Sequence, residues 1–335
     1  MANNKVTIKD VAREAGVSIS TVSNAINGVD VLLPETREHV LEVARRLHYV
    51  PNLNGKNPKS RETKVLGLFV TSIRGPYYSS LADEVYQSCK SSGYELQIFV
   101  GESPETILTN VFGKRVDGAI VLNNNVGTDE LKLLEQYEFP TVFIDREIDS
   151  KIAGCVVFDS YHEGELAAKH LIDLGHTNLM LVAGEKNNFD SIEREKGFVD
   201  VIKKAGLTLK KEYIVEGLFS QETSYYNMKE FLKKGIPLPD AIFACNDMSA
   251  IGVIDALKDA GYSVPGDVSI VGCDDIDMAK LTRPPLTTIR TSYEKQGKMA
   301  VEMLISMIRE GEQGTKVILN GKLMERESTA HKLRR

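Results

Sequence analysis

The chain has 335 residues, enough for two or three domains, and its 42% hydrophobic and 26% charged residues are ordinary for a globular protein. No apolar run approaches the length of a membrane span, and the N-terminus lacks the apolar core of a signal peptide, so we expect a cytoplasmic protein with no membrane partner. The first 64 residues carry a net charge of +3 and the remainder carries −9. A basic end on an acidic body favours contact with nucleic-acid phosphates at that end alone.

Two short helices separated by a glycine are predicted close to the N-terminus. Val11, Ala12 and Ala15 recur at helical spacing before Gly16, which is suited to ending the first helix. Thr7 can cap that helix, with Asp10 three residues further on.

The second helix is predicted to present its polar side to DNA. Ser18 can cap it, and Val22, Ala25 and Ile26 form an apolar face that packs inward. This arrangement is the helix-turn-helix, whose second helix enters the major groove. The residues predicted to contact DNA from this region are Thr7, Ser18, Ile19, Ser20, Thr21, Ser23, Asn24 and Asn27.

A third helix, roughly Glu35–Leu47, is predicted to pack on the first two. Pro34 suits its first turn, and Pro51 disfavours helix at the residue before it. The polar segment that follows contains glycine and proline and predicts a linker. We therefore expect a helical headpiece over residues 1–52, a linker over 53–64 and a body over 65–335.

Residues 7–52 resemble the headpiece of the lac repressor/galactose repressor (LacI/GalR) family of bacterial transcription regulators. The pattern is Thr-Ile-x-Asp-Val-Ala-x-x-Ala-Gly-Val-Ser-x-x-Thr-Val-Ser-x-x-Ile-Asn, followed by Tyr-x-Pro-Asn at residues 49–52. Later motifs extend the resemblance over essentially the whole chain, among them Asn246-Asp247-x-x-Ala250 and Pro285-Leu-Thr-Thr-Ile289. The resemblance implies further DNA contacts at Tyr49, Asn52, Lys56 and Pro58.

Two positions depart from the family pattern. Asn24 replaces a recognition-helix residue that is usually arginine, and asparagine suits adenine where arginine reads guanine. The linker reads Gly55-Lys56-Asn57-Pro58, with Pro58 where the family commonly has the leucine of a hinge helix. Because glycine and proline both oppose a helix, we expect a weaker or non-helical hinge.

After Lys64, strands and helices alternate, which predicts doubly wound α/β lobes. The expected fold is thus α/β: an all-α helix-turn-helix headpiece plus a two-lobed body of doubly wound parallel sheets. The resemblance implies that this body is periplasmic-binding-protein-like and that the chain crosses between lobes three times. We expect the crossings near Asp159, Ile289 and Ile318, which assigns residues 65–159 and 290–318 to one lobe and 160–289 and 319–330 to the other. The segment Gly101–Lys114 is short for a full crossover helix.

Ligands of such lobes bind at the carboxyl ends of strands, in the cleft between them. Tyr77 and Tyr78 follow the first body strand, and Asp145-Arg146 closes a later one, where a carboxylate beside a guanidinium can grip adjacent hydroxyls. The resemblance adds Arg194, Phe219, Asn246 and Asp274 as cleft positions. Asp159 is a further candidate, because it follows a predicted strand at a lobe crossing. The predicted effector-binding residues are Tyr77, Tyr78, Asp145, Arg146, Asp159, Arg194, Phe219, Asn246 and Asp274.

This donor set favours a monosaccharide effector, because carboxylates, amides and guanidinium suit hydroxyls and an aromatic face suits C–H groups. A purine requires a different hydrogen-bond pattern. Asp247 and Asp275 are expected to cap or brace the structure.

The resemblance implies a homodimer that reads a pseudo-palindromic double-stranded operator, with effector binding changing the angle between the lobes. Whether the effector releases the protein from DNA or promotes its binding to DNA stays open. A protein coregulator or a phosphorylated metabolite are alternative effectors, and a sugar-transport protein is a further alternative.

An enzyme is disfavoured because GxSxG, HExxH, Walker A and GxGxxG motifs are absent from the sequence. No cofactor and no metal is expected. The six histidines lack zinc spacing, and the acids between Asp274 and Asp277 lack further ligands nearby.

Overall fold

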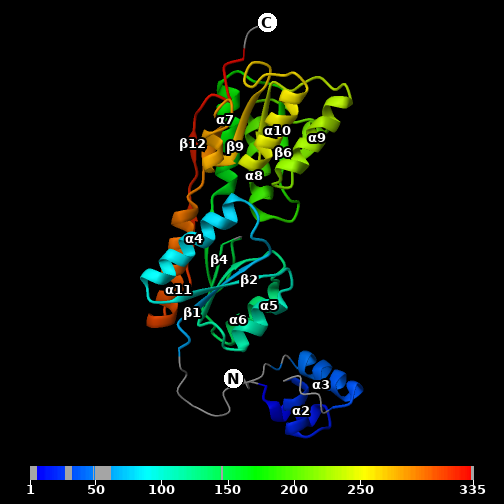
Figure 1. Cartoon of the computed structure of the whole chain (residues 1–335), viewed down its shortest axis with the longest axis vertical. Helices are drawn as coiled ribbons and strands as arrows, with labels where there is room; N and C mark the ends of the chain where they lie inside the picture. The colour runs from blue at the N-terminus through cyan, green and yellow to red at the C-terminus, as the bar shows by residue number, and fades with distance from the viewer. Residues whose placement is uncertain (1–5, 27–31, 48, 50–61, 145, 333–335) are drawn as a thin grey trace.

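The computed structural model describes residues 6–26, 32–47, 49, 62–144 and 146–332. It contains a helical headpiece and two α/β lobes, and in Figure 1 the lobe that holds most of the C-terminal half lies above the other. The predicted α/β architecture of a helical headpiece and two parallel-sheet lobes is confirmed.

Three helices form the headpiece: α1 (Ile8–Glu14), α2 (Ile19–Ile26) and α3 (Pro34–Arg46). Val11, Val22 and Val40, one from each helix, are fully buried against one another. The predicted cap at Ser18 is present, because its hydroxyl accepts the Thr21 N–H at 3.1 Å. Thr7 does not cap α1 with its side chain as predicted, since its hydroxyl and its N–H both donate to the Asp10 carboxylate, at 2.7 Å and 2.9 Å. These local bonds satisfy groups that a helix start leaves unpaired.

The first lobe is built on a sheet of six parallel strands in the order β11-β5-β4-β3-β1-β2. Helices α4 and α11 pack on one face of this sheet, and α5 and α6 pack on the other (Figure 1). Side chains alternate accordingly: Leu66 and Leu68 face α4 and α11, whereas Phe69 faces α5 and α6. The bounds are β1 (Val65–Val70), β2 (Glu95–Val100), β3 (Gly118–Leu122), β4 (Thr141–Phe143), β5 (Gly154–Phe158), β11 (Lys316–Leu319), α4 (Pro76–Ser91), α5 (Glu105–Phe112), α6 (Thr128–Gln136) and α11 (Tyr293–Glu310).

The second lobe repeats the scheme with the order β12-β10-β9-β8-β6-β7, in which only the edge strand β12 is antiparallel. Helices α7 and α8 cover one face, and α9 and α10 cover the other. The bounds are β6 (Leu179–Ala183), β7 (Ile214–Glu216), β8 (Ala241–Ala244), β9 (Ser269–Asp274), β10 (Thr287–Arg290), β12 (Lys322–Met324), α7 (Ser160–Asp173), α8 (Phe189–Lys204), α9 (Gln221–Lys233) and α10 (Asp247–Asp259), with short 3-10 turns at Lys211–Tyr213 and Asp277–Lys280.

The chain passes from one sheet to the other three times: after β5, between β10 and α11, and between β11 and β12. Strands β10 and β11 run one residue beyond Ile289 and Ile318, so the last two passages follow those residues directly. The segment between Gly101 and Lys114 contains α5, a helix of only eight residues.

Helices α7 and α8 approach so closely that only glycine fits at their contact. A Cβ at Gly164 would lie 2.0 Å from the Arg194 carbonyl oxygen, and one at Gly197 would lie 2.0 Å from the Tyr161 carbonyl oxygen. Both obstacles are backbone atoms, so the helices must separate to admit a methyl group.

We expect Gly164→Ala to lower the free energy of unfolding of the body by about 3 kcal/mol, because this overpacking cannot be relieved by a side-chain rotation. Urea titration followed by circular dichroism measures it. Gly101→Ala is the matched control, since its Cβ would meet only the Thr106 hydroxyl at an ordinary 3.4 Å. Equal stability of the two variants would show that the helix contact is not rigid.

Candidate functional site

The outer side of α2 offers a small, polar surface. Ser18, Ile19 and Ser20 are exposed, and the Ser18 hydroxyl lies 2.7 Å from that of Ser20. Thr21, Ser23 and Asn24 are half-buried along the same helix. Side chains of this size let a helix approach base edges closely.

The other predicted DNA contacts have different surroundings. The hydroxyl of Thr7 donates to Asp10 at 2.7 Å, and half-buried Tyr49 packs against the headpiece core. Asn27, Asn52, Lys56 and Pro58 lie outside the described residues, as does the hinge prediction that rests on Gly55 and Pro58.

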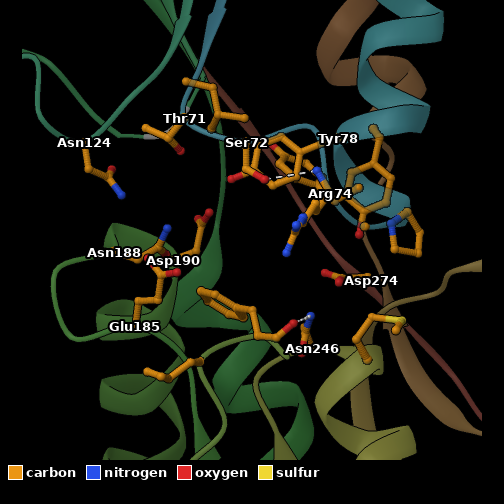
Figure 2. A pocket seen from close by; sticks show the side chains of 18 of the residues that line it. Thr71, Ser72, Arg74, Tyr78, Asn124, Glu185, Asn188, Asp190, Asn246 and Asp274 are labelled. Carbon is orange, nitrogen blue, oxygen red and sulfur yellow. Dashed lines mark hydrogen bonds between the residues drawn. The ribbon is translucent and has the colours of Figure 1, made fainter. Parts of the chain in front are cut away.

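A cavity of about 600 Å³ lies between the two lobes. Its walls come from segments that follow β1 and β3 in the first lobe, and β6, β7, β8 and β9 in the second. Figure 2 shows Tyr78, Arg74 and Asn124 on one side of this cleft and Asn188, Asp190 and Asn246 on the other. The cleft therefore occupies the carboxyl ends of parallel strands from both lobes, as predicted for a ligand site.

Arg194 is held at the base of the cleft by a buried ion pair. Its Nε donates to the Glu163 carboxylate at 2.8 Å, and one terminal nitrogen donates to the Cys245 carbonyl oxygen at 2.9 Å. The Arg194 side chain is only 6% exposed and that of Glu163 is fully buried. Burial raises the pKa of Glu163, and the adjacent guanidinium opposes that rise. The remaining N–H groups of Arg194 are thereby oriented at the cleft wall.

Asp274 ends β9 at the same wall, with a φ angle of 121°. Its side chain keeps some contact with solvent, but burial raises the pKa of Asp274 to about 7, with Arg194 acting in the opposite direction. Glu163 and Asp190 add to the rise. This carboxyl can thus change between hydrogen-bond acceptor and donor close to neutral pH.

Asn246 is hydrogen-bonded to the backbone of Phe219. The Asn246 side chain caps α10 by accepting the Ser249 N–H at 2.9 Å, and its amide donates to the Phe219 carbonyl oxygen at 3.1 Å. The Phe219 ring lies over Gly184, where a Cβ would approach it to 2.3 Å. The loop is therefore held so that an aromatic ring lines the cleft.

Tyr77 and Tyr78 begin α4 and both line the cleft. The rings lie edge to face, with centroids 5.4 Å apart. The Tyr77 hydroxyl donates to buried Gln296 at 3.3 Å. Gln296 in turn donates to the Ile144 carbonyl oxygen just after β4 and to the Val156 carbonyl oxygen in the middle of β5. Tyr77 is thus braced by the core, and Tyr78 is the ring labelled at the cleft in Figure 2.

Two predicted residues are not among those lining the cleft. The Arg146 guanidinium donates to the Asn123 and Asn124 carbonyl oxygens, so it supports the loop after β3. Asp159 caps α7 through the His162 N–H at 3.0 Å. Asp145 lies outside the described residues.

Asp247 and Asp275 are braces, as expected. Buried Asp247 accepts from the Ile276 N–H and the Thr288 hydroxyl. Asp275 pairs with Arg290 and Arg326.

Sequence reasoning missed several residues that line the cleft, chiefly Arg74, Asn124 and Asp190, and it missed the buried Glu163 carboxylate that holds Arg194. Asp190 accepts the Ser160 hydroxyl at 2.6 Å and lines the cavity four residues before Arg194. That spacing on one helical face was a usable signal for Asp190. The sequence contained no comparable signal for Glu163, because its partner Arg194 is 31 residues away along the chain.

Among the described residues, no group of three or more histidine, cysteine, aspartate or glutamate side chains is arranged to hold a metal ion. Within the same residues, no helix combines the length and apolar character needed to cross a bilayer.

Both the headpiece and the two-lobed body are similar to known protein families. Residues 7–52 match the bacterial regulatory proteins of the lacI family, and residues 168–329 match a periplasmic binding protein-like domain. The HTH-type transcriptional repressor PurR of Pasteurella multocida (strain Pm70) is 35% identical over 333 residues, which cover 98% of this chain and 99% of the relative.

Solved structures agree with this relationship. A complex of the transcriptional regulator CelR with cellobiose has a TM-score of 0.74 at 28% identity, covering 96% of this chain and 99% of that chain. The lac repressor dimer bound to operator and the anti-inducer ONPF has a TM-score of 0.71 at 26% identity, covering 98% of this chain and 100% of that chain.

Proposed function

Because this chain belongs to the lacI family of bacterial regulatory proteins and is a DNA-binding transcriptional repressor, not an enzyme, we propose that a neutral sugar in its inter-lobe cleft controls its affinity for operator DNA. The operator is pseudo-palindromic, the working unit is a homodimer, and the protein acts in the cytoplasm. The predicted family resemblance is confirmed, whereas the effector is a proposal.

The observation that carries the sugar proposal is the combination of polar and aromatic groups at the cleft base. Arg194 offers oriented N–H donors, Asp274 offers a carboxyl group, and Phe219 and Tyr78 offer ring faces. Sugars need directional hydroxyl partners and a flat apolar surface for their C–H groups. The cellobiose bound by the structurally similar CelR supports the same ligand class.

The proposed mechanism couples the cleft to the headpieces through lobe movement. A sugar that contacts both walls favours a smaller angle between the lobes, because only the closed arrangement makes both sets of contacts. In a dimer this shift changes the spacing of the two headpieces, and a helix-turn-helix dimer reads half-sites at one defined spacing.

A thermal-shift screen against neutral pentoses and hexoses, their phosphates and purines tests the proposal. A ligand that binds only the native state raises the melting temperature. A rise with a neutral sugar, accompanied by a change in operator affinity, supports it. A rise only with a phosphate or a purine would overturn the sugar assignment, and a flat screen would favour a protein coregulator.

Asn24→Arg is expected to change the preferred half-site. Arginine pairs bidentately with guanine and asparagine with adenine, so the variant should gain about 1–3 kcal/mol of preference for guanine at the base facing residue 24. Selection of binding sites from random DNA measures this. Asn24→Gln is the control, since it keeps the amide that suits adenine. Selection of guanine by the unmodified protein would show that Asn24 does not read that base.

A further inference from the structure

The outer end of the cleft carries a second polar cluster, apart from the group around Asp274. In the first lobe, Asn124 and Asn125 follow β3. In the second lobe, Glu185, Asn187 and Asn188 follow β6. Figure 2 shows Asn124 across the cleft from Asn188 and Glu185, on the side away from Asp274 and Asn246.

These rim groups retain hydrogen-bonding capacity. The side chains of Asn124, Glu185 and Asn187 are exposed and make no hydrogen bond to another described residue. Asn188 uses its carbonyl oxygen to accept the Ser191 N–H at 3.0 Å, which leaves its amide N–H groups as donors. Asn125 uses its amide on the Glu102 carbonyl oxygen at 3.0 Å, which leaves its carbonyl oxygen as an acceptor. Both lobes thus present donors and acceptors to the same end of the cavity.

The cavity is larger than one sugar ring requires. A hexose fills roughly 200 Å³ at the packing density of protein interiors, whereas the cavity measures about 600 Å³. A ring bound among Asp274, Arg194 and Phe219 would leave the rim cluster without contact to the ligand. Two linked rings match both polar clusters.

The charged side chains that line the cavity disfavour a ligand with an anionic group at the rim. Arg194 is already paired with Glu163, so the unpaired cation of the lining is Arg74. The acidic side chains of the lining are Glu102, Glu185, Asp190 and Asp274. A phosphate or carboxylate at the rim would meet Glu185 there, and like charges in a cleft repel strongly.

We propose that the effector is a neutral oligosaccharide of at least two units. Its first ring binds at the cleft base, and its second ring donates to and accepts from the rim residues Asn124, Glu185 and Asn187. This inference rests on the proposed function and replaces a free monosaccharide by a longer ligand of the same class. Because the rim residues belong to both lobes, the second ring adds contacts that exist only when the lobes close.

Isothermal titration calorimetry of the full chain with neutral disaccharides and their constituent monosaccharides tests the proposal. The probes are cellobiose, maltose, sucrose, melibiose and trehalose, with glucose, fructose and galactose. One disaccharide is expected to bind at least tenfold more tightly than either of its units, because it adds several hydrogen bonds.

Two variants separate the subsites. Asn124→Ala with Asn187→Ala should weaken disaccharide binding about tenfold and leave monosaccharide binding within twofold. The matched control is Gln313→Ala, an exposed amide outside the cleft lining, which should change neither affinity. Asp274→Ala should weaken both ligands.

The outcomes distinguish the two proposals. A monosaccharide that binds as tightly as the disaccharide containing it, or rim variants that bind the disaccharide normally, would overturn the second subsite and leave the sugar proposal standing. If none of these sugars binds while a sugar phosphate or purine does, the sugar proposal fails and the second subsite fails with it.

Discussion

Arg194→Ala is expected to abolish the effector response and to destabilise the body by about 3 kcal/mol. The substitution removes the only ion-pair partner that Glu163 has among the described residues, and because the Glu163 side chain is fully buried, leaving its charge unpaired is costly. Glu163 can take up a proton to limit the loss, so the destabilisation should grow with pH, by up to about 1.4 kcal/mol per unit above the ordinary glutamate pKa. Urea titrations at pH 5 and pH 8 measure the difference.

A double variant separates the stability effect from the binding effect. Glu163→Leu combined with Arg194→Met replaces the pair by apolar side chains and should recover most of the lost stability. Ligand contact at Arg194 is still missing, so operator binding should remain insensitive to the effector. If the double variant responds to effector normally, Arg194 acts only as a structural brace.

Asp274→Asn is expected to reduce the fall in stability between pH 4 and pH 7. Burial raises the pKa of Asp274 to about 7, from an ordinary value of 3.8. Between those values the folded state holds a proton that the unfolded state releases, so stability falls as pH rises. The variant removes this contribution, while Asp247, whose pKa is also raised by burial, retains its own. Thermal unfolding across this pH range gives the comparison.

Ionisation of Asp274 should also change the affinity for the effector with pH. A sugar hydroxyl donates to an ionised carboxylate, so binding should tighten from pH 6 to pH 8, by at most about tenfold per unit below the pKa. Asp274→Asn should bind more weakly and show a flat profile. A parent profile that is equally flat would mean that no ligand hydroxyl donates to Asp274.

Local signals were sufficient for the headpiece. The apolar spacing inside each helix, the cap at Ser18 and the turn at Gly16 each depend on residues only a few positions apart, and the structure confirms the three helices. The alternation of apolar runs and helices likewise predicted the two parallel sheets, because buried parallel strands have an almost continuous apolar sequence.

Signals were weaker for several elements of the body. The unpredicted elements were helix α6, between β3 and β4, and the elements around the last two lobe crossings, namely α11, β10, β11 and β12. The last two of these strands have four and three residues, and β12 lies at a sheet edge, so their pairing is decided by contacts with distant strands.

Patterns among neighbouring residues were enough to predict a helix-turn-helix headpiece, two parallel-sheet lobes and polar residues at strand ends. The roles of those polar residues follow only from the tertiary structure. It pairs Glu163 with Arg194, directs Arg146 to loop carbonyls, uses Asp159 as a helix cap and brings Asn124 opposite Asn188. The physical reason is that capping and periodicity depend on neighbours in the chain, whereas burial, pKa and the two walls of a cleft depend on segments that meet only after both lobes have folded.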